Sequence, residues 1–252
     1  MAKFERSDIF LVTGASSGIG RQTALRINEL GGSVIATARR AQKLADLKEK
    51  ATHPDSLFIE EKDLSKDLDD LPKWVLSLSK KYGKLKGVVM AAGVCQIFSL
   101  KAISIQKTKE LFDINFFSNL ALAKGFCDKR VNIGSGSSMV FVSSVGSMVG
   151  EAGLSEYSAS KGAINSAVRS LAMEHGKLGI RVNSVLPGIV RTEMIEMLGD
   201  IYDQKYLDEM SAKYPLGLGN PQDVADPICF LLADEARWIT GQNIVIDGGG
   251  SL

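Results

Sequence analysis

The sequence of 252 residues has little of several features that mark special classes of protein. Its three cysteines and two histidines are too few and too widely spaced for a disulfide framework or a metal site. Thirty basic residues against 29 acidic ones give a net charge of +1, which lacks the concentrated positive field that nucleic acid or an anionic membrane requires. No apolar run approaches the roughly 18 residues of a membrane span, and the first residues are too charged for a secretory segment. We therefore expect a soluble, cytoplasmic protein with reduced thiols, no metal, and neither nucleic acid nor membrane as a partner.

What the chain does contain is close to the average of folded proteins, with one excess. Hydrophobic residues make up 45% and charged residues 23% of the sequence. Glycine is the exception, because its 25 residues are about a tenth of the chain against a usual share of about 7%. The positions of these glycines therefore carry the information.

Short apolar runs alternate with helical patterns along almost the whole chain. Strands are expected at 9–12, 34–37, 57–59, 88–92, 139–142, 181–185 and 244–246, and helices at 19–30, 41–51, 68–82, 108–124 and 155–175. Such alternation implies right-handed βαβ units with parallel strands. The sequence predicts an α/β protein: one doubly wound Rossmann domain over residues 1–252, a seven-stranded parallel sheet with helices on both faces.

Residues 191–215 interrupt this rhythm after the sixth expected strand. The segment is long and contains several methionines and tyrosines. A long excursion near the carboxyl edge of a sheet is often a lid over a site, although a helical hairpin packed on its own domain is the alternative. We predict a lid.

A glycine-rich turn follows the first expected strand and opens the first expected helix. Glycines there allow a tight turn and let backbone N–H groups approach a pyrophosphate, to which the helix N-terminus adds partial positive charge. The predicted dinucleotide-binding residues of this turn are Gly14, Ser16, Ser17, Gly18, Ile19 and Gly20.

The second expected strand ends in Ala38, Arg39 and Arg40, with no acidic residue. An acid there would bind the ribose of NAD and repel a 2′-phosphate, whereas arginine binds phosphate in a bidentate manner. We therefore expect NADP(H) to be preferred and NAD(H) to remain possible, the alternative being that both arginines are solvated charges. Asp63, after the third expected strand, either accepts a hydrogen bond from the adenine amino group or caps the segment that begins at Leu64.

A possible catalytic pair lies on the helix expected from residue 155. Tyr157 and Lys161 are four residues apart and share one face of that helix. A lysine ammonium about 4 Å away would lower the pKa of the phenol by up to about three units, which favours general acid–base catalysis. Ser143 and Ser144, at the end of the fifth expected strand, could position a substrate oxygen against the tyrosine. With no histidine partner, neither serine is expected to be a hydrolase nucleophile.

Taken together, Thr13-Gly14-x-x-x-Gly18-x-Gly20 and Tyr157-x-x-x-Lys161, with a serine thirteen residues before the tyrosine, resemble the short-chain dehydrogenase/reductase family. The resemblance covers essentially the whole chain. It implies that Ser144, Tyr157 and Lys161 are catalytic and that Asn115, which holds a water for proton relay, is the fourth catalytic residue. Ala91 departs from the asparagine usual in the family, which implies a loss of rigidity between the central strands.

The resemblance also implies contacts to the nicotinamide half of the cofactor, and an oligomeric state. Besides Tyr157 and Lys161, the implied cofactor-binding residues are Leu64, Ala92, Gly93, Pro187, Gly188, Ile189 and Thr192. Homotetramers are usual among relatives, so a homotetramer is expected.

The leading hypothesis is an NADP-dependent oxidoreductase that interconverts a ketone or aldehyde with an alcohol on a small-molecule substrate. One alternative is a 3-oxoacyl-acyl-carrier-protein reductase of fatty-acid synthesis. That role needs a basic entrance for an acidic carrier, for which Lys129, Arg130 and Lys177 are candidates. A second alternative is a non-catalytic NADP-binding regulator. The substrate itself is not readable, although Gln96 to Phe98, Gly150 and Leu154 are expected near the mouth of the site.

Overall fold

The computed structural model describes residues 2–199 and 201–252 and contains one parallel sheet of seven strands. The strands are β1 (Ile9–Thr13), β2 (Ser33–Ala38), β3 (Leu57–Glu61), β4 (Leu85–Met90), β5 (Ser138–Val142), β6 (Arg181–Pro187) and β7 (Asn243–Ile246). Their order in space is β3-β2-β1-β4-β5-β6-β7, and every neighbouring pair is parallel. The predicted doubly wound, seven-stranded sheet is therefore confirmed.

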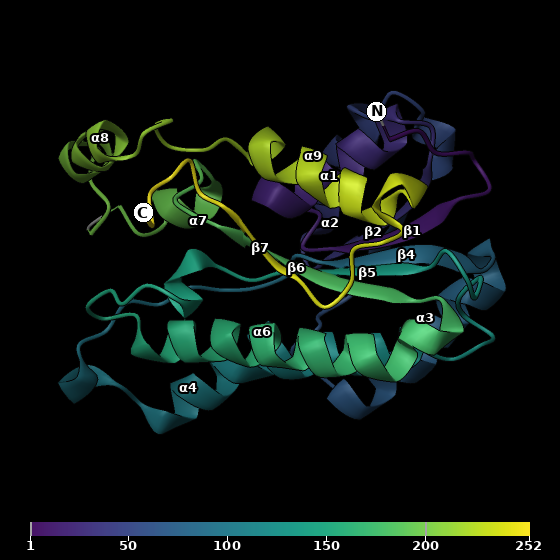
Figure 1. Ribbon diagram of the computed structural model, residues 1–252, viewed down its shortest axis with the longest axis horizontal. Helices are drawn as coiled ribbons and strands as arrows, with labels where there is room; N and C mark the ends of the chain where they lie inside the picture. The colour runs from purple at the N-terminus through teal and green to yellow at the C-terminus, as the bar shows by residue number, and fades with distance from the viewer. Residues whose placement is uncertain (1, 200) are drawn as a thin grey trace.

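Helices cover both faces of this sheet (Figure 1). They are α1 (Gly18–Glu29), α2 (Ala41–Glu49), α3 (Leu71–Tyr82), α4 (Ile105–Phe112), α5 (Ser118–Phe126), α6 (Ser155–His175), α7 (Glu193–Glu196), α8 (Gln204–Lys213) and α9 (Pro221–Leu232). Figure 1 shows α1, α2 and α9 over one face and α3, α4 and α6 over the other, while α8 stands clear of the sheet. Among the helices of the described residues, none is both long and apolar enough to span a bilayer.

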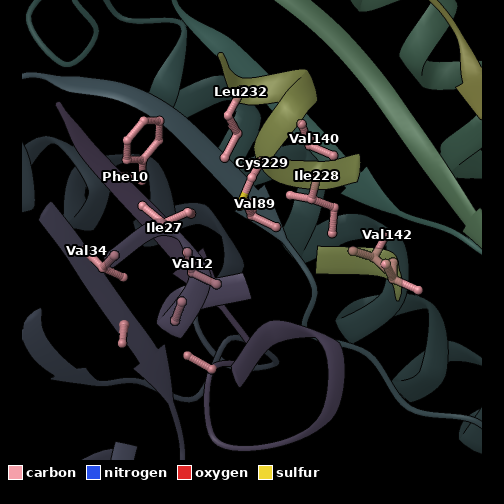
Figure 2. Packing of buried hydrophobic residues seen from close by; sticks show 14 of the residues in the cluster. Phe10, Val12, Ile27, Val34, Val89, Val140, Val142, Ile228, Cys229 and Leu232 are labelled. Carbon is pink, nitrogen blue, oxygen red and sulfur yellow. The ribbon is translucent and has the colours of Figure 1, made fainter. Parts of the chain in front are cut away.

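Alternate residues of each central strand supply the two halves of the core. In β1, Phe10 and Val12 pack toward α1 and α9, as Figure 2 shows, whereas Leu11 packs toward α3, α5 and α6. All three side chains are fully buried. Strands covered on both faces read as continuous apolar runs, which is the pattern by which the sequence predicted them.

Outside segment 191–215, which contains the short helices α7 and α8, two elements differ from the sequence prediction. The helix expected over 108–124 is two helices joined by a π-helical turn, Asp113–Phe117, which carries Asn115. Helix α9 was not predicted, because it begins at Pro221 and contains Pro227, and proline inside a helical pattern argues against a helix. A capping box between Asn220 and Asp223 starts α9 and offsets part of that cost.

Candidate active site

The predicted site residues follow strands whose carboxyl ends meet at one edge of the sheet. The sheet changes direction between β1 and β4, since consecutive strands run outward from β1 on one side and from β4 on the other. Open parallel sheets bind ligands in the crevice at this switch point. The glycine turn follows β1, and Ser143 and Ser144 follow β5.

Three glycines of the turn occupy positions that a side chain would disturb. Gly14 and Gly18 have φ values of 65° and 53°, in the left-handed region. A Cβ on Gly20 would lie 2.5 Å from the carbonyl oxygen of Gly14. The turn therefore requires glycine at these positions, as the sequence predicted for a close approach of its backbone to a ligand.

The ends of β1 and β4 are held together by a hydroxyl group. Thr13 Oγ1 accepts hydrogen bonds from the N–H groups of Ala91 (3.0 Å) and Ala92 (3.1 Å), and donates to the carbonyl of Val89 (3.3 Å). The loss of rigidity expected from Ala91 is thus offset by Thr13, which ties the two central strands without a side-chain amide.

Arg40, rather than Arg39, contacts the glycine turn. Its guanidinium donates to Ser16 Oγ at 3.0 Å and to Ser17 Oγ at 2.9 Å. The same group forms an ion pair with Glu193, the first residue of α7, at 2.8 Å. Arg39 is exposed and acts electrostatically on Asp63.

Asp63 organises the turn that follows β3. Its Oδ1 accepts hydrogen bonds from the backbone N–H and hydroxyl of Ser65, at 3.0 and 2.7 Å. Burial opposes ionisation of Asp63, but these hydrogen bonds and the charge of Arg39 outweigh it and hold the pKa below its usual value. Leu64 is buried beside it and starts a turn rather than a helix. Asp63 therefore caps the turn that begins at Leu64. Its predicted hydrogen bond with the adenine amino group stays a prediction.

The predicted catalytic side chains come together between β5 and the start of α6. Tyr157 and Lys161 lie on α6, with Lys161 Nζ 5.8 Å from the centre of the Tyr157 ring. The ammonium group donates to the carbonyl of Val142 at 2.9 Å. The hydroxyl of Ser143 donates to the carbonyl of Lys161 at 3.0 Å and is buried, which leaves Ser144 as the serine that faces Tyr157.

The pKa values of the pair differ from the sequence expectation. Burial, with a smaller contribution from Cys95, raises the pKa of Tyr157 well above its ordinary value, and a hydrogen bond with Ser144 only partly offsets this. Burial lowers the pKa of Lys161 to about 8. The expected lowering of the phenol pKa is therefore wrong for the protein by itself, because desolvation of the buried phenol dominates.

Asn115 connects the π-helical turn to both sides of the site. Its Oδ1 accepts from the N–H of Val94 at 2.9 Å, and its Nδ2 donates to Ser160 Oγ on α6 at 3.0 Å. A Cβ on Gly93 would lie 3.1 Å from Asn115 Oδ1 and 3.3 Å from Lys161 Nζ. The asparagine is fully buried and thus fixes the loop after β4 against the catalytic helix.

The segment after β6 lies against the glycine turn. Pro187 ends β6, and a Cβ on Gly188 would lie 2.8 Å from Asp247 Cβ. The carbonyl of Ile189 accepts from the N–H of Gly219 at 3.0 Å, which holds the segment in place. A Cβ on Gly18 would lie 3.1 Å from Thr192 Cγ2. The structure thus brings the residues predicted for the nicotinamide half beside those predicted for the pyrophosphate, while their contacts to a cofactor stay predictions.

The mouth of the site contains polar groups from the predicted lid. The hydroxyl of Tyr202 donates to Glu151 Oε1 at 3.1 Å, and that of Tyr206 to the same oxygen at 3.4 Å. The N–H of Phe98 donates to the carbonyl of Gly153 at 3.0 Å, which joins the loops after β4 and β5. Segment 191–215 is therefore attached to the loop after β5 by its tyrosines.

The sequence did not indicate several residues that the structure places in this region. Cys95 is close enough to influence the pKa of Tyr157 and Lys161, and its own pKa is raised to about 12 by burial. Glu151 lies in a loop and Glu193 begins the short helix α7, and no spacing or motif marks either of them.

The basic residues suggested as an entrance for an acidic carrier lie at the opposite edge of the sheet. Lys177 follows the end of α6, a helix of 21 residues and so about 30 Å long, whereas Tyr157 is in its first turn. Lys129 and Arg130 precede Val131, whose carbonyl accepts from the first residue of β4. They therefore cannot form the mouth of the site, and that suggestion is wrong.

The donor set of this edge fits a dinucleotide. The turn offers close backbone approach and a helix N-terminus for a pyrophosphate, and Arg40 offers a planar guanidinium beside it. Thr192 closes the cradle opposite Gly18. Residues 14–20, 40 and 187–192 are thus the ones that would hold the cofactor.

Comparisons with known proteins agree with this arrangement. A family model described as enoyl-(acyl carrier protein) reductase matches residues 14–251. The chain is 32% identical to an L-rhamnose 1-dehydrogenase (NAD(P)(+)) of Sphingomonas sp., over 95% of this chain and 94% of the relative. It is also 32% identical to a 3-oxoacyl-[acyl-carrier-protein] reductase of Thermotoga maritima, over 96% of each chain.

Solved structures resemble the chain over its whole length. A short-chain dehydrogenase/reductase (glucose/ribitol dehydrogenase) from Brucella melitensis superposes with a TM-score of 0.90 at 28% identity, covering 100% of both chains. A putative NAD(P)-dependent gluconate 5-dehydrogenase from Beutenbergia cavernae, with NADP bound at low occupancy, has a TM-score of 0.91 at 27% identity, covering 99% of this chain and 98% of that one.

Proposed function

This chain belongs to the short-chain dehydrogenase/reductase family, whose dehydrogenases act on CH–OH groups with NAD(P), and we propose that it prefers NADP(H) and uses Tyr157 as its general acid and base. The reaction interconverts a ketone or an aldehyde with an alcohol. The observation that carries the proposal is the convergence of Ser144, Tyr157 and Lys161 at the edge of the sheet that also carries the glycine turn. In this proposal the protein is a cytoplasmic homotetramer of single-domain subunits.

A bound nicotinamide dinucleotide supplies or accepts the hydride, and the chain supplies the proton. Tyr157 Oη is protonated at neutral pH because burial raises its pKa, so it is ready to donate to the oxygen of a carbonyl that is being reduced. The hydroxyl of Ser144 holds that oxygen against the phenol. Lys161, whose ammonium lies over the tyrosine ring, stabilises the phenolate that the proton leaves behind.

Asn115 has a positioning part in this scheme. Its side chain fixes the loop after β4 and contacts Ser160, whose hydroxyl donates to the carbonyl of Tyr157 at 2.7 Å. The π-helical turn that carries Asn115 breaks the regular helical hydrogen-bond ladder, a feature that is frequent at functional sites. Proton relay through a water held there completes the proposal.

Preference for NADP(H) rests on the absence of an acid at the end of β2 and on the two arginines there. Arg40 donates hydrogen bonds to the serine hydroxyls of the glycine turn, and Arg39 is close enough to Asp63 to lower its pKa. Both are within the region where a 2′-phosphate is recognised in this fold.

For the substrate, the mouth favours a molecule with several hydroxyl groups. Glu151 and the hydroxyls of Tyr202 and Tyr206 offer hydrogen-bonding groups to sugar hydroxyls, and two of the chain's relatives and neighbours are named as sugar dehydrogenases. The runner-up, a 3-oxoacyl-acyl-carrier-protein reductase, is favoured by the second relative. In both cases segment 191–215 acts as the lid.

The test is NADPH oxidation against ketones, aldehydes, aldoses and 3-oxoacyl thioesters, with Tyr157→Phe beside the wild type. We expect turnover with at least one class, and Tyr157→Phe to lower kcat by at least about 100-fold while the Kd for NADPH stays within about threefold. Tyr82→Phe is the matched control, because Tyr82 contacts Glu60 far from the site. Activity retained by Tyr157→Phe contradicts the mechanism, and NADPH binding without turnover of any substrate favours a regulator.

A further inference from the structure

Glu193 bridges two basic residues beside the glycine turn. Its Oε2 pairs with Arg40 Nη1 at 2.8 Å, and its Oε1 pairs with Lys43 Nζ at 2.9 Å. The two cations hold the pKa of Glu193 below its usual value, so the carboxylate is ionised at neutral pH. The two oxygens of the Glu193 carboxylate thus pair with two different cations.

The same arginine is the cation that faces the phosphate-binding turn. Arg40 donates to the hydroxyls of Ser16 and Ser17, which hold its guanidinium beside the turn. A phosphate monoester and a carboxylate both bind a guanidinium through parallel charge-assisted hydrogen bonds. A 2′-phosphate bound here therefore meets Arg40 already paired with another anion.

The backbone keeps Glu193 in this position. Its neighbour Thr192 lies against Gly18 of the turn, and Arg191 donates its N–H to the carbonyl of Gly219 at 2.9 Å. The residue lies 153 positions along the chain from Arg40, so the pairing is a property of the fold and not of local sequence. Its side chain is 29% exposed, less than that of Arg40 at 41% or Lys43 at 46%.

We propose that Glu193 competes with the 2′-phosphate of NADP(H) for Arg40 and Lys43, and thereby limits the preference of this protein for the phosphorylated dinucleotide. The inference rests on the proposed function, because it assumes that the dinucleotide binds along the glycine turn with its adenosine ribose at the end of β2. NADP(H) has to separate the ion pairs or share their cations with a like charge. NAD(H) carries no 2′-phosphate and leaves the pairs intact.

The test measures equilibrium binding by titration calorimetry, without turnover, for wild type, Glu193→Gln and Glu196→Gln. The probes are NADPH and NADH, and the fragments 2′,5′-ADP and 5′-AMP, which isolate the 2′-phosphate from the nicotinamide. Glu196 is the matched control because it is an exposed carboxylate on the same short helix.

Glu193→Gln is expected to bind NADPH and 2′,5′-ADP about three- to tenfold more tightly than the wild type, since exposed ion pairs contribute modestly. The Kd values for NADH and 5′-AMP are expected to stay within about twofold, and Glu196→Gln to resemble the wild type for all four probes. In an Arg40→Ala background, the gain from Glu193→Gln should shrink markedly, because one of the two contested cations is gone.

An equal gain for NADPH and NADH overturns the inference, since Glu193 would then act on the site in general and not on the 2′-phosphate. Unchanged NADPH binding in Glu193→Gln overturns it as well. If none of the four probes binds to any of the proteins, the dinucleotide site itself is refuted and the proposed function fails with it.

Discussion

Burial determines the protonation of the two side chains at the centre of the site. From spacing alone, Lys161 should pull the pKa of Tyr157 downward. In the structure the lysine donates to the carbonyl of Val142, and desolvation raises the pKa of the phenol and lowers that of the ammonium. Tyr157 is thus protonated in the free protein, which is the form that the proposed mechanism requires for reduction of a carbonyl.

Lys161 should leave a signature in the pH dependence of stability. Its pKa is about 8 in the folded protein and 10.5 in the reference state, so the unfolded chain binds more protons between these values. The free energy of unfolding should therefore rise from about pH 8 to about pH 10, by up to about 3 kcal/mol, and the burial cost is fully present below pH 8. Urea unfolding of the free protein across this range measures the effect.

The control for this measurement is Lys161→Met, which removes the titrating group and keeps most of the volume. The rise should be absent from the variant, and the difference between the two curves isolates Lys161 from other groups. Tyr157, with its raised pKa, acts in the opposite direction only above about pH 10. Parallel curves for wild type and variant would show that the lysine is not desolvated.

Among the elements, the turn between β1 and α1 is the one whose residues are most constrained. The backbone at Gly14 and Gly18 has left-handed φ values, which favour glycine, and there is no space for a side chain at Gly20. The hydroxyl of Thr13 then joins this turn to the end of β4. An element built this way can present backbone N–H groups to a ligand without rearranging.

Replacing glycine by alanine should have opposite effects at two positions. Gly20→Ala places a Cβ 2.5 Å from the carbonyl oxygen of Gly14, which should cost about 1–3 kcal/mol of stability and weaken dinucleotide binding. Gly162→Ala, inside α6 and with nothing within 4 Å, should stabilise the protein by about 0.5–1 kcal/mol. Chemical unfolding together with NADPH titration measures both effects. A stable Gly20→Ala protein with unchanged NADPH affinity would show that the turn does not require glycine there.

For the molecule as a whole, large apolar side chains remain exposed on two separate surfaces. Trp238, before β7, is 94% exposed, and Phe117 and Leu120, at the junction of the π-helical turn with α5, are 46% and 39% exposed. Exposed apolar groups of this size frequently mark contact surfaces between subunits. Two such surfaces suit the expected homotetramer, because a tetramer with three perpendicular two-fold axes uses more than one interface.

Sedimentation equilibrium should therefore report a mass of about four times 27.1 kDa. Leu120→Lys should reduce the assembly, because it places a charge among the apolar residues of α5. A control change at an exposed position just beyond the end of α5, Lys129→Ala, should leave the mass unchanged. A monomer in the wild type at micromolar concentration would contradict the expectation.

Apart from Ser144, which only the resemblance to the family selected over Ser143, the sequence by itself determined the fold class, the glycine turn and the placement of Tyr157 and Lys161 on one helix face. Each depends on local patterns, namely apolar runs, glycine at fixed offsets and the helical spacing of four residues, together with the rule that parallel strands end at one edge. Where local patterns conflicted, as at Pro227 of α9 or the π-helical turn at Asn115, prediction failed, because packing against the sheet outweighs local preference.

Only the tertiary structure decided which arginine meets the turn, where Lys177 lies, and how Tyr157 and Lys161 ionise. The ion pair between Arg40 and Glu193 joins residues 153 positions apart, and the sequence around each residue does not predict it. Charge–charge energies and pKa values depend on distance and burial in three dimensions, whereas the sequence carries only distance along the chain.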